Sequence, residues 1–181
     1  MHDPADDLDL MPSPFEEGLC LWSQADGTPD SLAYDVAENV RLARGDEDFG
    51  VCLEIRKVDA VQRLRYMGEA PMPRGAYVEI SARLKHMRGP SGGARIAAWP
   101  GGSAGRQVSG LDCQGPEHSL DPEGSVTTIS AVIGPVAGAG VDLVWSPDVL
   151  YAHIGLDLTG PNGGVTRIEN IAMRNVTRRF S

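Results

Sequence analysis

The chain has 181 residues, the usual size of one domain with a substantial hydrophobic core. Its formal net charge of −9 argues against binding to nucleic acid or to an anionic membrane surface, because both need a basic face on the protein. The 22 glycines, the 13 prolines and the short apolar runs between turn signals predict an all-β fold, a sandwich or a barrel.

The amino-terminal residues contain neither the basic nor the apolar region of a secretory signal, and no run approaches the roughly 20 apolar residues that span a bilayer. We therefore expect synthesis in the cytoplasm. Cys20, Cys52 and Cys113 are odd in number and widely spaced, which indicates neither a disulfide framework nor a zinc site. Cys20 and Cys52 are interpreted as small strand residues, with a disulfide between them as the alternative. We expect no cofactor.

Residues 1–14 form an acidic, proline-rich arm with four aspartates and three prolines. The residues that it could bury are Leu8, Leu10 and Met11, too few to build a core. The arm is interpreted as a loose terminus, or as a segment that docks these residues on a neighbouring subunit. The folded domain is expected to span residues 15–181.

Strands are predicted where apolar and polar residues alternate, because alternate residues of a strand face opposite sides of its sheet. The predicted strands are residues 39–44, 51–57, 63–67, 77–85, 95–99, 126–133, 141–145, 150–158 and 165–177. Trp22 and Trp145 are assigned to the core, the latter because it shares the phase of Val141 and Leu143. The last strand shifts phase near Glu169, as a β-bulge would require.

Three connections carry specific expectations. Residues 45–48, Gly-Asp-Glu-Asp, are interpreted as a solvated acidic turn, with a calcium site as the alternative. Residues 160–164 predict a hairpin turn. Residues 101–124 are rich in Gly, Ser and Pro and predict a long irregular loop that makes contacts, in which Cys113 and His118 are too few for a metal site.

The strand over residues 77–85 has the clearest alternation. Its predicted core row is Val78, Ile80, Ala82 and Leu84, and its predicted outer row is Tyr77, Glu79, Ser81, Arg83 and Lys85. Residues 88–93 predict a turn, so the strand over residues 95–99 is expected to pair with it antiparallel. The pair would then present Tyr77, Arg83, Arg95 and Trp99 on one solvent-exposed surface.

The strand over residues 150–158 has a second mixed outer row, made of Tyr151, His153, Gly155 and Asp157. Gly155 has no side chain to keep a ligand at a distance. Aromatic rings stack on the apolar faces of sugars, and Arg, His and Asp bind sugar hydroxyls. The predicted carbohydrate-binding residues are Tyr77, Arg83, Arg95, Trp99, Tyr151, His153 and Asp157. For each aromatic, packing under a loop or against a subunit is the alternative.

Three short motifs resemble the galactose-binding-like jelly-roll domains of carbohydrate-binding modules. They are Phe-Glu-x-Gly-Leu-x-x-Trp at residues 15–22, Asp-Phe-Gly-x-x-Leu-Glu at residues 48–54 and Ile-Glu-Asn-Ile at residues 168–171. They occur in the order found in that family and span most of the chain. The resemblance implies an antiparallel jelly-roll β-sandwich.

Four further segments look like a narrower group of jelly-roll domains. The segments are residues 26–29, 64–66, 95–99 and 155–164. Similar domains are attached to bacterial β-helix polysaccharide-processing proteins and occur in head-spike proteins of phage-derived gene transfer agents. This resemblance implies a domain of a phage-like particle that binds cell-surface or capsular polysaccharide. No β-helix is predicted in this chain.

Motifs for nucleophilic, metal-dependent and nucleotide-dependent catalysis are absent from the sequence. Glu79 and Asp157 are the one carboxylate pair that could be nominated for glycoside hydrolysis, and no pattern places them together. We therefore expect a non-catalytic polysaccharide-recognition domain and a homo-oligomer with other spike or capsid subunits as partners. The alternatives are an adaptor subunit that binds no sugar and an accessory module of a polysaccharide-acting enzyme.

Overall fold

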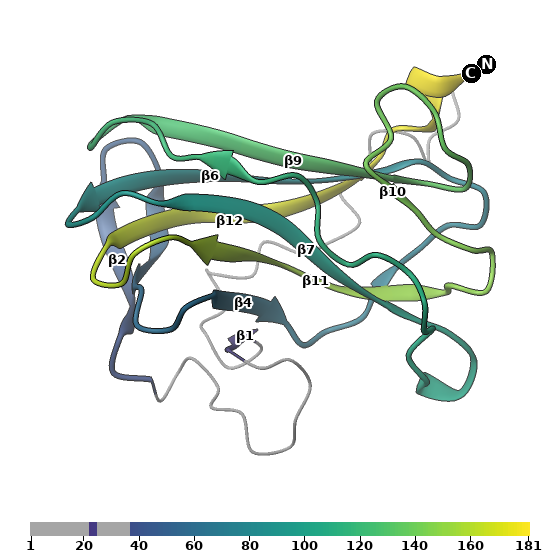
Figure 1. Cartoon of the computed structure of the whole chain (residues 1–181), viewed down its shortest axis with the longest axis horizontal. Coiled ribbons are helices and arrows are strands. Elements are labelled where there is room, and N and C mark those ends of the chain that lie inside the picture. Colours follow the sequence, from purple (N-terminus) through teal and green to yellow (C-terminus); the bar gives the residue numbers. More distant parts are fainter. Residues whose placement is uncertain (1–21, 25–36) are drawn as a thin grey trace.

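The computed structural model describes residues 22–24 and 37–181, which form two facing β-sheets (Figure 1). In the first, here the β6 sheet, the strand order is β10 (Leu143–Val144), β9 (Val126–Gly134), β6 (Val78–Arg88), β12 (Val165–Asn175), β3 (Gly50–Arg56) and β2 (Val40–Asp46). In the second, here the β11 sheet, the order is β1 (Trp22–Ser23), β4 (Gln62–Tyr66), β11 (Tyr151–Thr159), β7 (Gly93–Gly101) and β8 (His118–Ser119), with β5 (Ala70–Pro71) also paired to β11.

All of these strand pairs are antiparallel except the short β9–β10 pair, which is parallel. Two short 3₁₀ turns, η2 (Ser103–Gly105) and η3 (Thr177–Phe180), are the helical elements of the described residues. None of the helices in this part of the chain has the length and apolarity to cross a membrane. The predicted all-β, antiparallel jelly-roll sandwich is confirmed.

The core lies between the sheets and is formed by the inner rows of the strands. On β6 the buried row is the predicted one: Val78, Ile80, Ala82 and Leu84. Trp22 and Trp145 also belong to this core, as predicted. The phase shift on β12 is confirmed as a register shift between Ile168 and Ile171.

The predicted pairing of β6 with β7 is wrong, because these consecutive strands lie in different sheets (Figure 1). The predicted hairpin at residues 160–164 is wrong for the same reason, since it joins β11 to β12 across the sandwich. Alternation determines which face of a strand is buried but does not determine its partner. The two crossover turns pack against each other: a Cβ on Gly89, where φ is +79°, would lie 2.7 Å from the carbonyl oxygen of Gly163.

The loop that follows β7 runs back along the edge of that strand. Ala98 donates a backbone hydrogen bond to Cys113 (2.8 Å), and Gly115 donates one to Ile96 (2.8 Å). Trp145 Nε1 donates a hydrogen bond to the Asp112 carbonyl at 2.8 Å, which ties the loop to the core. The predictions for residues 1–14, Cys20 and the motif at residues 26–29 fall outside the described residues.

Candidate functional site

The outer rows of β7 and β11 lie side by side on the outer face of the β11 sheet. In the antiparallel register, His153 is opposite Trp99 and Asp157 is opposite Arg95. On the other side of β11, Asp157 is opposite Arg63 of β4. The structure therefore brings together five of the seven predicted site residues, because β11 is the strand that β7 and β4 share.

Asp157 holds two arginine side chains of this face. It is fully buried, and it accepts hydrogen bonds from Arg63 Nε at 2.8 Å and from Arg95 Nε at 3.1 Å. Arg63 Nη2 lies 3.2 Å from its second oxygen. A carboxylate held in this way orients two guanidinium groups, and because it is buried it is not accessible to a sugar hydroxyl.

Trp99 lies under arginine side chains. The guanidinium carbons of Arg63 and Arg65 are 4.9 and 4.6 Å from the centre of its ring. Trp99 is only 7% exposed, so the prediction of an open aromatic platform at this residue is wrong. The physical reason is cation–π stacking, which uses the ring face that a sugar would need. The alternation of residues 63–67 indicated that both arginines face outward, but it did not indicate that they lie beside Trp99.

Tyr151 and His153 form the more accessible end of the face. The Tyr151 ring lies over Gly101, where an added Cβ would collide with it, and packs edge-on to His153 with ring centres 5.6 Å apart. His153 Nδ1 lies 3.0 Å from the Gly68 carbonyl oxygen. Burial lowers the pKa of His153, although the Gly68 contact opposes this effect. Because a carbonyl oxygen only accepts, the contact with Gly68 requires that His153 donate from Nδ1.

Gly155 has a different role from the one predicted. A Cβ at this position would collide with the carbonyl of Leu64 and come within 3.0 Å of the Cα of Arg65. The missing side chain therefore accommodates the neighbouring strand β4 rather than a ligand.

Tyr77 and Arg83 lie away from this face, on the side of the sandwich formed by the β6 sheet. The Tyr77 ring stacks on Phe180 with centres 4.1 Å apart, and Arg83 pairs with Glu169 at 2.7 Å. They were grouped with Arg95 and Trp99 only because β6 was expected to pair with β7.

The outer face of the β6 sheet carries a cross-strand row of charges. Arg41, Glu54, Arg167 and Lys85 are register neighbours on β2, β3, β12 and β6. Glu54 accepts hydrogen bonds from Arg41 and Arg167, each at 2.8 Å. Glu54 therefore lies between two arginines, whereas Arg167 and Lys85 are adjacent cations that need an anion from outside the row.

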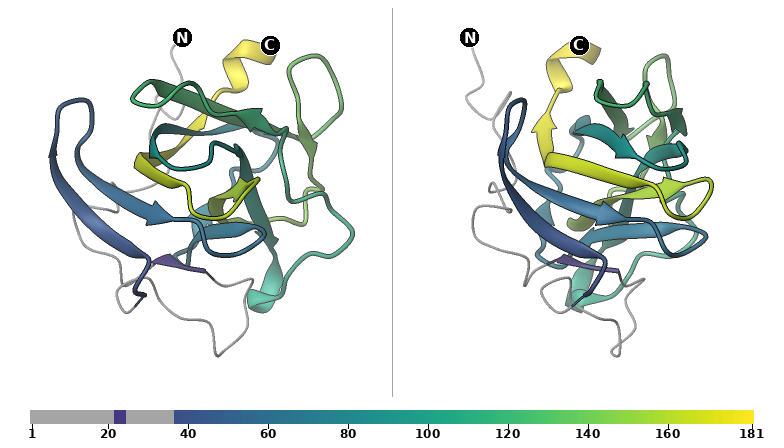
Figure 2. Two further views of the ribbon diagram at one scale, coloured as in Figure 1. Left: turned by 60° about the vertical axis from the view of Figure 1, so that its left-hand side comes forward. Right: turned by 90° about the vertical axis from the view of Figure 1, so that its left-hand side faces the viewer.

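Asp46 lies at the end of β2, where the chain turns into β3, and contacts Lys85 and Arg167 of this row. The curved strands β2 and β3 are visible in Figure 2. The Asp46 carboxylate lies 2.8 Å from Lys85 Nζ and 2.7 Å from Arg167 Nη1. Asp48 also binds Lys85, at 2.7 Å. The interpretation of residues 45–48 as a solvated turn holds for Gly45, Glu47 and Asp48, which are exposed. It is wrong for Asp46, which is buried in an ion network.

The network shifts the pKa values of its members. Burial opposes ionisation of Asp46, but hydrogen bonds from Lys85 and Arg167 outweigh it and hold the pKa of that carboxyl well below its usual range. Burial also opposes ionisation of Glu54, whose pKa is lowered by hydrogen bonds from Arg167 and Arg41. The pKa of Lys85 is raised, because its bonds to Asp46 and Asp48 outweigh its burial.

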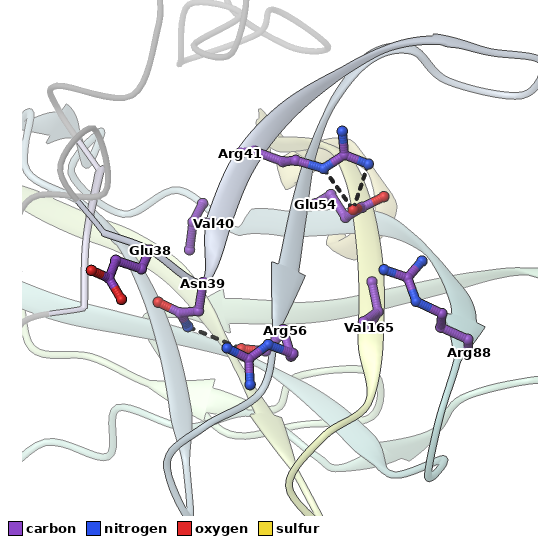
Figure 3. Close-up of a pocket in the computed structure, with 8 residues that line it drawn as sticks. All are labelled: Glu38, Asn39, Val40, Arg41, Glu54, Arg56, Arg88 and Val165. Carbon is purple, nitrogen blue, oxygen red and sulfur yellow. Dashed lines mark hydrogen bonds and ion pairs between the residues drawn. The ribbon is translucent and has the colours of Figure 1, made fainter.

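A pocket of about 160 Å³ opens beside this charged row (Figure 3). It is lined by Glu38, Asn39, Val40, Arg41, Glu54, Arg56, Arg88 and Val165. Figure 3 shows Arg56 and Arg88 on either side of Val165, with the Arg41–Glu54 pair above them. None of these residues was predicted as a site residue, because the pocket combines residues of β2, β3, β6 and β12, which are separated along the chain.

The pair nominated for glycoside hydrolysis is separated by the sandwich. Glu79 is on the β6 sheet and pairs with Arg179 at 2.6 Å, whereas Asp157 is on the β11 sheet. Within the described residues, no group of three or more His, Cys, Asp or Glu side chains is arranged to hold a metal ion.

Comparisons with known proteins gave similarity in structure only. No protein-family model and no curated protein matches the sequence. The CBM22-1 xylan-binding domain of Paenibacillus barcinonensis Xyn10C has a TM-score of 0.59 and 12% identity, over 97% of this chain and 99% of that one. TmCBM61, solved in complex with β-1,4-galactotriose, has a TM-score of 0.53 and 12% identity, over 93% of this chain and 99% of that one.

A phage protein is similar over part of its length. The enzymatically active domain of tailspike protein 4 from bacteriophage CBA120 has a TM-score of 0.55 and 13% identity, over 95% of this chain but 22% of that one. At these identities the similarity concerns the fold. The chain has the jelly-roll β-sandwich fold found in carbohydrate-binding modules and in a phage tailspike, as its motifs predicted.

Proposed function

We propose that this protein is a non-catalytic polysaccharide-recognition domain that binds sugar on the outer face of the β11 sheet. The observation that carries the proposal is the alignment of the outer rows of β7 and β11 in one register. Tyr151 and His153 would contact the sugar, and Arg63 and Arg95 would bind its hydroxyls. Asp157 holds both arginines in place, and Trp99 stacks against Arg63.

The proposed site combines the two features that sugar binding requires. A half-buried aromatic ring offers an apolar surface to a pyranose, and guanidinium groups fixed by a buried carboxylate offer oriented donors. Prior orientation limits the entropy lost on binding. The fold shared with carbohydrate-binding modules supports this function, and the separation of Glu79 from Asp157 supports a domain without hydrolytic activity.

The setting we propose is a phage-derived gene transfer particle, in which the protein is a head-spike component that attaches to cell-surface or capsular polysaccharide. The sequence motifs and the fold shared with a phage tailspike domain support this setting. Other spike or capsid subunits would be its partners. Binding by one domain is expected to be weak, and a homo-oligomer would raise the avidity through effective concentration.

Isothermal titration calorimetry with xylan and β-1,4-galactan oligosaccharides and with capsular polysaccharide tests the proposed site. Tyr151→Ala is expected to weaken binding about tenfold or more, because aromatic stacking and its apolar contact are lost together. Leu150→Ala is the matched control, since Leu150 is exposed and adjacent but outside the proposed site. Absence of binding by the unaltered protein, or equal loss in both variants, would refute the proposal.

The chain length of the polysaccharide gives a second measurement. Prolonged incubation with the protein should leave it unchanged, as measured by size-exclusion chromatography. Shortened chains would identify a depolymerase.

A further inference from the structure

The pocket on the β6 sheet contains two arginines in one cross-strand row. Val165 is the register partner of Arg56 on β3 and of Arg88 on β6. Adjacent strands lie about 4.8 Å apart, so the two arginine backbones are roughly 10 Å apart with Val165 between them. Two like charges therefore flank a single apolar side chain.

Neither guanidinium is neutralised within the part of the chain that the structure describes. Glu54, which also lines the pocket, is held by Arg41 and Arg167 instead. In Figure 3, Glu38 lies at the opposite end of the pocket from Arg88. The two arginines thus form a local positive site on a protein whose net charge is −9.

The shape and chemistry of the pocket fit a sugar that carries an oxyanion. Guanidinium forks match the geometry of carboxylate and sulfate groups. Val165, which is 4% exposed, forms an apolar floor against which a sugar ring can lie. Because Arg41 and Glu54 are already paired with each other, an incoming anion would be attracted mainly by Arg56 and Arg88.

We infer that the pocket lined by Arg56, Val165 and Arg88 is a second glycan-binding site, selective for acidic sugars that carry a carboxylate or a sulfate. The inference rests on the proposed function in one respect, that the protein is a glycan-binding domain. The second site differs from the proposed site on the β11 sheet in its sheet, its residues and the charge of its ligand. An acidic polysaccharide would be held on the β6 sheet while neutral sugar is bound on the β11 sheet.

The test is a titration with oligogalacturonate, with its methyl ester, and with a sulfated galactan oligosaccharide. The unaltered protein should bind at least one anionic oligosaccharide, and that binding should weaken as salt is raised. Each of Arg56→Gln and Arg88→Gln is expected to weaken it about tenfold, the size of effect expected for a hydrogen bond to a charged group. Arg44→Gln removes an exposed arginine of β2 outside the pocket and should leave the affinity unchanged.

The results separate this inference from the proposed function. Loss of oligogalacturonate binding in Arg56→Gln, with binding of neutral oligosaccharide retained, supports the second site. Binding of sulfated galactan alone also supports it and identifies sulfate as the preferred group. No binding of either anion, equal binding of the methyl ester, or unchanged affinity in a variant that combines Arg56→Gln with Arg88→Gln overturns it. Failure of the proposed function would appear instead as absent binding of neutral sugars.

Discussion

Replacing Asp46 by Asn tests whether the ion network stabilises the β2–β3 turn. The Asp46 side chain is 1% exposed and binds Lys85 at 2.8 Å and Arg167 at 2.7 Å. Removal of one partner from a buried ion pair costs about 3–5 kcal/mol. Since Lys85 keeps Asp48 and Arg167 keeps Glu54, we expect the lower end, about 3 kcal/mol.

A loss of that size corresponds to a fall in Tm of about 6–12 °C for a domain of this length. Urea unfolding, followed by the fluorescence of the buried tryptophans, measures the change in free energy. Glu169→Gln is the control, because its pair with Arg83 is exposed and should contribute at most about 1 kcal/mol. If Asp46→Asn costs no more than this control, the network does not stabilise the turn.

The same variant has a defined pH dependence. The network holds the pKa of Asp46 well below its usual range, so ionised Asp46 stabilises the fold fully above about pH 4, its unfolded pKa. That contribution is lost as the pH falls further. The difference in unfolding free energy between the unaltered protein and Asp46→Asn should be constant at neutral pH and shrink below about pH 4. A difference that grows on acidification would contradict the conclusion that ionised Asp46 stabilises the fold.

Three further predictions concern other parts of the sandwich. Gly155→Ala should lower the unfolding free energy by about 1–3 kcal/mol in urea titrations, because its Cβ collides with the Leu64 carbonyl. Burial lowers the pKa of His153, so on acidification this side chain is protonated in the unfolded chain before it is protonated in the folded protein. The free energy of unfolding should therefore fall as the pH drops below about 6.5. In His153→Gln, the Tm should no longer depend on pH in this way. Trp145→Phe removes the hydrogen bond to Asp112 and should cost about 1 kcal/mol. It should also speed proteolysis of the loop that follows β7, and unchanged cleavage would contradict the conclusion that this hydrogen bond holds the loop.

The sequence predicted which face of each strand is buried more accurately than it predicted which strands pair. The row from Val78 to Leu84 is buried as predicted, because burial of one face imposes a period of two on the sequence itself. The partner of each strand is set by long-range packing, which leaves no such period. The turn at residues 88–93 therefore looked like a hairpin, although it crosses from one sheet to the other.

The candidate site shows the same division. Arg95, Trp99, Tyr151, His153 and Asp157 were predicted from outward positions on two strands, and the structure places those strands side by side. Exposure could not be predicted, because stacking of two guanidinium groups over Trp99 depends on β4 lying next to β11. The role of each predicted residue toward a ligand stays a prediction.

By itself, the sequence determined an all-β fold, the inner and outer rows of its strands and the bulge in β12, because these features follow from local alternation and turn chemistry. Only the tertiary structure decided that Asp157 orients two arginines, that Asp46 is buried among cations, and that Arg56 and Arg88 share one pocket. Each of these contacts joins residues far apart in the chain. Their energies depend on distance and burial, which no local pattern records.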